Sequence, residues 1–207
     1  FNWIEIQVMK NVLISLLFTL GLCAHSNGTD LEAQASEIAT LFLSYKLVIS
    51  DSQGLINDPA LGDKGLTGSV VRQKGREKYR ELSGTDYHVS EDPLIGKAQI
   101  ALERSIDKVI SQAQPLINTQ GVGFKGFITA VFARRLAKEF SARMHGAIDF
   151  KFTAPVDVLR SSANRSDSWE EGVFSQKFSQ ADWQKNKEFF EKTSEGFRWM
   201  KPLYHEG

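Results

Sequence analysis

Cysteine is nearly absent from this sequence of 207 residues, which contains only Cys23. A single cysteine cannot form an intramolecular disulfide, and the rest of the chain has no thiol that could act as a nucleophile or bind zinc. The nucleophile elbow of hydrolases, the phosphate-binding loop, the dinucleotide-binding fingerprint and the zinc-protease helix are missing as well. We therefore predict that the protein is not an enzyme.

The sequence also lacks a surplus of charge of either sign. Lys and Arg together number 25, Asp and Glu together number 25, and the formal net charge is zero. A protein that binds nucleic acid needs a basic surplus to displace counterions from the phosphates, so we predict no nucleic-acid partner. No two of the 4 histidines are spaced to present a pair on one helix face, and the sequence leaves a bound metal unknown.

No apolar run is long enough to span a bilayer, which takes about 20 residues. Residues 12–22 form a shorter apolar run that follows Met9 and Lys10, and small residues at Ala24 and Ser26 suit cleavage before Asn27. We predict that residues 1–26 are upstream residues and a signal peptide with its start at Met9. Residues 27–207 are then one exported, periplasmic domain.

Two other interpretations of this leader stay open. The segment that ends at Cys23 loosely matches a lipoprotein box, which would attach a lipid to that cysteine, although Leu22 is bulky where the box has a small residue. An uncleaved membrane anchor is the second. In all three cases the protein meets a membrane only through this segment or through the lipid.

Apolar residues at steps of three and four predict helices in the first two thirds of the body. They cover residues 31–48, residues 91–118 and a third helix from about Val131 that Gly146 ends, with His145 near its C-terminus. Thr67 is predicted to cap a further helix over residues 69–82, after a loop rich in glycine.

The last third of the chain changes to the period of a strand. Apolar and polar residues alternate over residues 148–153, and aromatic segments flank residues 193–196 as in a hairpin, with a polar loop and a short helix in between. The expected fold class is α+β, with N-terminal helices packed on a small antiparallel sheet.

Three groups of motifs resemble the cyanobacterial Tll-type haem-protein family, a domain of unknown function with a PAS-like sensor fold. The first covers residues 54–68, and the second covers residues 121–134. The third comprises residues 153–155, 164–165, 169–170 and 197–204. The resemblance implies a periplasmic sensory or redox domain, acting alone or within a signalling protein.

Many members of that family carry a c-type haem on a Cys-x-x-Cys-His motif that follows the segment matching residues 197–204. This sequence stops at Gly207, before that place, so we expect a domain cut short at its C-terminus, with haem c in a full-length form. The alternative is a haem-free module of the cell envelope that binds a small ligand such as an organic acid.

The resemblance to a PAS-like sensor implies a pocket between helices and sheet, with aromatic walls and cations that could meet haem propionates or a small anion. The partners would be a small molecule or haem, together with a signalling or electron-transfer protein. The candidate ligand-binding residues are Phe124, Lys125, Phe127, Phe132, Arg134, Arg198 and Tyr204.

Overall fold

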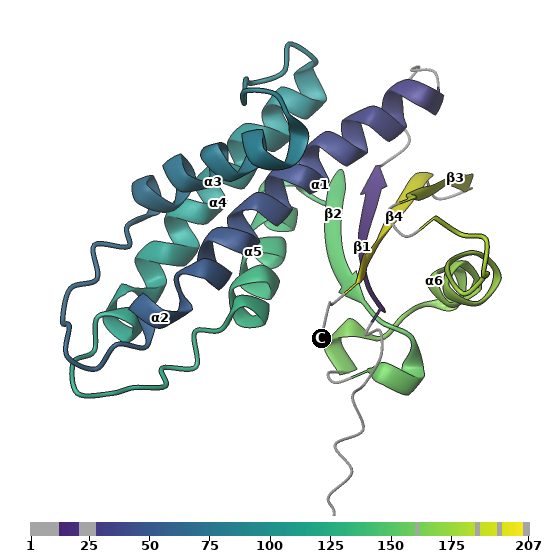
Figure 1. The fold of residues 1–207 in the computed structure, drawn as a ribbon. Coiled ribbons are helices and arrows are strands. Elements are labelled where there is room, and N and C mark those ends of the chain that lie inside the picture. Colours follow the sequence, from purple (N-terminus) through teal and green to yellow (C-terminus); the bar gives the residue numbers. More distant parts are fainter. Residues whose placement is uncertain (1–12, 21–27, 160–161, 185–186, 194–195, 205–207) are drawn as a thin grey trace, which may run out of the picture.

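The structure is a computed structural model that describes residues 13–20, 28–159, 162–184, 187–193 and 196–204. Its elements form a helical layer, a sheet beside it and a small helical region on the opposite face of the sheet (Figure 1). The helical layer consists of α1 (Gly28–Asp51), α2 (Gln53–Ile56), α3 (Gly68–Ser83), α4 (Pro93–Ile117) and α5 (Thr129–Met144).

The remaining elements follow α5 along the chain, except for one strand. They are β2 (Ile148–Thr153), two 3-10 turns (Val156–Val158 and Ser162–Asn164), α6 (Ser168–Val173), a π-helical turn (Phe174–Phe178), β3 (Phe189–Thr193) and β4 (Gly196–Tyr204). The expectation of an α+β fold with N-terminal helices on a small antiparallel sheet is confirmed.

Capping side chains begin α3 and α4, and a turn with positive φ ends α5, as predicted for Thr67 and Gly146. The Thr67 side chain accepts from the Val70 N–H and begins α3, and Asp92 accepts from the N–H groups of Leu94 and Ile95 at the start of α4. His145 takes up a left-handed conformation, with φ of 53°, at the end of α5. Positive φ is rare outside glycine, and Gly146 follows at φ of 73° to complete the turn into β2.

The sheet has four antiparallel strands in the order β2-β1-β4-β3. The predicted strand over residues 148–153 and the predicted hairpin, now β3 and β4, are both present. The remaining strand, β1 (Leu13–Leu20), comes from the apolar run of the predicted signal peptide and lies between β2 and β4. The cleavage site proposed before Asn27 falls outside the described residues, so processing of the leader stays a prediction.

Aromatic rings fill the interface between the helical layer and the sheet. The ring centroids of Phe42 on α1 and Phe150 on β2 are 4.7 Å apart, and those of Phe140 on α5 and Phe150 are 4.9 Å apart. Phe42, Phe140 and Trp199 are completely buried. A smaller apolar cluster around Phe174, Phe178 and Met200 packs beneath α6 on the opposite face. The space between sheet and helices is therefore packed core.

The described helices include none that is both long enough and apolar enough to cross a membrane.

Candidate functional site: a basic groove between two helices

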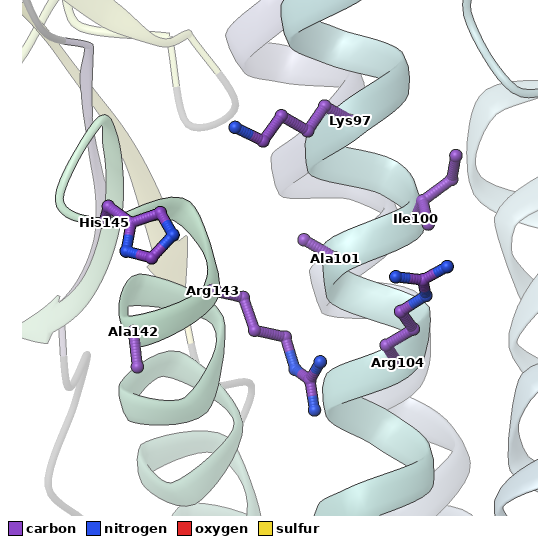
Figure 2. Close-up of a pocket in the computed structure, with 7 residues that line it drawn as sticks. All are labelled: Lys97, Ile100, Ala101, Arg104, Ala142, Arg143 and His145. Carbon is purple, nitrogen blue, oxygen red and sulfur yellow. The ribbon is translucent and has the colours of Figure 1, made fainter.

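An open groove of about 720 Å³ lies between α4 and the C-terminal end of α5. On α4 it is lined by Lys97 and by Ile100, Ala101 and Arg104, which lie three, four and seven residues after Lys97, so that all share one helix face. Figure 2 shows Ala142, Arg143 and His145 on the facing helix and turn. The groove therefore combines an apolar floor with basic side chains from both helices.

The lining contains no acidic residue. Lys97 and Arg104 are exposed, and neither makes an ion pair or a side-chain hydrogen bond within the part of the chain that the structure describes. A positive potential above an apolar floor suits a small organic anion, because charge-assisted hydrogen bonds to guanidinium groups are the strong ones.

Arg143 is held in place by one carboxylate on its own helix. Its Nη2 atom lies 3.0 Å from Oε1 of Glu139, and the same carboxylate accepts from Lys108 of α4, 2.8 Å away. The Nε atom of Arg143 is buried and has no hydrogen-bond partner among the described residues. Arg143 extends from α5 into the gap between the helices in Figure 2, so this cation is positioned by Glu139 and still has donor capacity.

The residues that the sequence suggested for a pocket are not gathered in one place. Phe127 and Phe132 do meet, with ring centroids 6.2 Å apart, but both are buried in the core. Phe124 is 74% exposed on the loop before α5, and Arg134 is exposed on α5. Tyr204 ends β4, where its backbone pairs with Leu13.

Lys125, another of these residues, is buried together with Lys64 where two loops meet. The Nζ of Lys125 donates to the backbone oxygens of Val122 (2.8 Å) and Asp58 (3.3 Å), and Lys64 also donates to the Asp58 oxygen, at 2.8 Å. Burial lowers the pKa of Lys125, and the neighbouring Lys64 charge lowers it further. The two lysines thus tie the loops at the far end of the helical layer together.

Arg198 belongs to a separate polar cluster under α6. Its guanidinium stacks on Trp169 at 4.3 Å from the ring centroid and pairs with Asp167, with Nη2 and Oδ2 2.7 Å apart. The completely buried Glu170 accepts from Lys151 at 2.7 Å and from Thr153 at 3.1 Å. This cluster fastens α6 to β2 and β4, on the opposite face of the sheet from the helical layer.

A covalent c-type haem does not fit the residues present. Its attachment needs two thiols and a histidine ligand, whereas the sequence has one cysteine, which lies outside the described residues. Among the residues that the structure describes, no cluster of three His, Cys, Asp or Glu side chains could hold a metal ion. The packed interface of Phe42, Phe140 and Phe150 leaves no place there for a macrocycle.

Sequence reasoning missed Lys97, Ile100 and Arg104 as site residues. The helical period places these two cations and the apolar residue on one face of residues 91–118. The sequence does not show which helix packs beside that face, so it could not indicate the groove. Comparison with known proteins adds no relative: no family model, no curated protein and no solved structure matches the chain.

Proposed function

We propose that this chain is a PAS-like sensory domain that acts outside the cytoplasm and binds a small organic anion, without haem, in the groove between α4 and α5. The observation that carries the proposal is the lining of that groove, in which Lys97, Arg104, Arg143 and His145 surround an apolar floor without a carboxylate. The resemblance to the Tll-type family and the antiparallel sheet with the helical layer packed on one of its faces support the PAS-like assignment.

The groove is placed so that an occupant acts on the rest of the fold. α5 leads through His145 and Gly146 directly into β2, and Phe140 of α5 packs against Phe150 of β2. Phe150 also contacts Phe42 of α1. An anion that draws α4 and α5 together therefore shifts β2 and α1, and α1 passes the change to a signalling partner.

Isothermal titration with succinate, citrate and an uncharged polyol of similar size tests the proposal. We expect a carboxylate to bind, the polyol not to bind, and the double variant Lys97→Gln, Arg104→Gln to lose at least about tenfold in affinity, because each charge-assisted hydrogen bond contributes about 1.5–3 kcal/mol. The matched control is Arg134→Gln, Lys138→Gln, which removes two exposed cations of α5 that do not line the groove.

Equal loss in both double variants would mean that only net charge matters and would contradict the proposed site. A pyridine haemochrome spectrum of the exported protein tests the haem-free part separately. We expect no covalently attached haem, and a c-type spectrum from this chain would contradict that part.

A further inference from the structure

The strand β1 occupies a slot between two strands that do not pair with each other. Its 8 residues pair with β4 along their whole length, and residues 15–20 also pair with the 6 residues of β2. Strands in a sheet lie about 4.8 Å apart, so β2 and β4 are separated by about twice that distance. The strands β2 and β4 are the two walls of this slot. If β1 left, both walls would expose unpaired backbone groups.

Each wall of the slot is anchored without the help of β1. Phe150 of β2 packs between Phe42 of α1 and Phe140 of α5. On β4, the indole N–H of Trp199 donates to Glu188 at 3.0 Å, and Glu188 in turn accepts from Ser36 of α1 at 3.1 Å. The two walls are therefore tied separately to the helical layer, and closing the gap would have to break one set of contacts.

Glu170 of α6 bridges the two walls on the opposite face of the sheet. Its carboxylate accepts from Lys151 and Thr153 of β2, and its Oε1 lies 3.6 Å from Nη2 of Arg198 on β4. That Oε1 has no hydrogen-bond partner among the described residues. This bridge spans β1 and fixes the spacing of β2 and β4, so the slot is built into the fold.

The segment in the slot has the composition of a strand that is covered on both faces. Such strands are nearly continuous apolar runs, and Leu13–Leu20 contains no charged residue. The same run has the form of a cleavable leader, and cleavage before Asn27 would take the central strand away. The same segment therefore forms the central strand of the sheet and has the features of a leader that is removed.

We propose that the slot is a strand-acceptor site. Leu13–Leu20 fills it in the unprocessed chain, and after leader removal it binds an extended, uncharged and mainly apolar segment of another polypeptide, antiparallel to both β2 and β4. Main-chain hydrogen bonds to the two walls supply the affinity, as in strand addition to a sheet edge, but here on two sides. This inference is independent of the anion groove, which lies on α4 and α5.

The test uses the full chain, expressed in the cytoplasm so that the leader remains, with a protease site introduced within residues 21–27. After cleavage, a fluorescent peptide with the sequence of residues 10–20 is added and followed by anisotropy. The control peptide carries Leu16→Pro and Leu17→Pro, which remove one ladder N–H toward each wall. We expect the first peptide to enter the slot and the control to bind at least tenfold more weakly.

Absence of peptide entry into a cut protein that keeps its circular dichroism would overturn the proposal, whether the original strand never leaves or β2 and β4 join directly. If the cut protein aggregates, cleavage is repeated with either peptide in excess. Protection by the first peptide alone supports a strand-acceptor site, and aggregation with both peptides overturns it.

Discussion

Gly75 of α3 packs directly against the ring of Tyr45 of α1: a Cβ atom on Gly75 would overlap with Cδ1 and Cε1 of Tyr45. Tyr45 is completely buried, and its hydroxyl donates to Glu103 at 3.3 Å, so the ring has little freedom to move. We expect Gly75→Ala to lower the free energy of unfolding by about 1–3 kcal/mol, the usual cost of overpacking a core. Urea denaturation measures the change.

Gly54→Ala is the matched control for that substitution. Gly54 lies in the short helix α2, and an added Cβ would meet nothing within 4 Å. Alanine is favoured over glycine in helices by about 1 kcal/mol, so this variant should be as stable as the parent or more stable. Equal stability of the Gly75 and Gly54 variants would contradict the close helix contact.

The N-terminus of α4 depends on one side chain. Oδ1 of Asp92 accepts from the N–H groups of Leu94 at 2.9 Å and Ile95 at 3.0 Å. Asp92→Ala should reduce the free energy of unfolding by about 1 kcal/mol, the typical loss of a cap, while Asp92→Asn retains an acceptor and should be close to neutral. Thermal unfolding of both variants tests this, and Glu91→Ala, which removes an exposed neighbour, serves as the control.

Caps and periodicity made most of the helical layer predictable. Thr67 and Gly146 gave the start of α3 and the end of α5, because their effects act within one helical turn, and the helix predicted over residues 91–118 is α4 within two residues at each end. The alternation over residues 148–153 predicted β2, and in the structure Ile148 and Phe150 are buried on one face while Asp149 and Lys151 on the other face are only partly buried.

The strand β1 could not be predicted as a strand. An uninterrupted apolar run is the pattern of a leader and also of a strand covered on both faces, so nothing in residues 13–20 distinguishes the two. The run is identified as a strand only by its pairing with β2 and β4, which lie more than a hundred residues further along the chain.

The groove was unpredictable for a similar reason. The shared face of Lys97, Ile100 and Arg104 follows from the helical period, but Arg143 joins it only because α5 packs on α4. Lys125 shows the opposite failure: it was predicted to be a pocket cation that could meet haem propionates or a small anion, yet backbone oxygens of two loops accept from its ammonium group.

Glu170 should be the most sensitive carboxylate under α6. It is completely buried, and Glu170→Ala leaves Lys151, Thr153 and Arg198 without this acceptor. Removing one partner of a buried ion pair typically lowers the free energy of unfolding by about 3–5 kcal/mol. Glu170→Gln keeps an acceptor for Thr153 and should lose less. Urea denaturation followed by Trp fluorescence gives both values, and similar stability of the alanine variant and the parent would contradict the bridge.

Asp167 should make the stability of this cluster depend on pH. Burial alone would raise its pKa, but the hydrogen bond from Arg198 and the N–H of Glu170 outweigh burial and hold the pKa below its ordinary value of 3.8. A carboxyl with a depressed pKa stabilises the fold above its unfolded pKa, and that contribution disappears as the pH falls through the folded pKa. Asp167→Asn should therefore lower Tm at neutral pH and have progressively less effect in acid.

The comparison requires thermal unfolding of the parent and Asp167→Asn from neutral pH to below 3.8, with Asp182→Asn as the control. Asp182 is exposed and makes no ion pair with any residue that the structure describes. The asparagine at position 167 still accepts from the Glu170 N–H, so the helix cap remains and only the charge is lost. A Tm difference that stays constant across this range would contradict the depressed pKa of Asp167 and its pairing with Arg198 as the source of the effect.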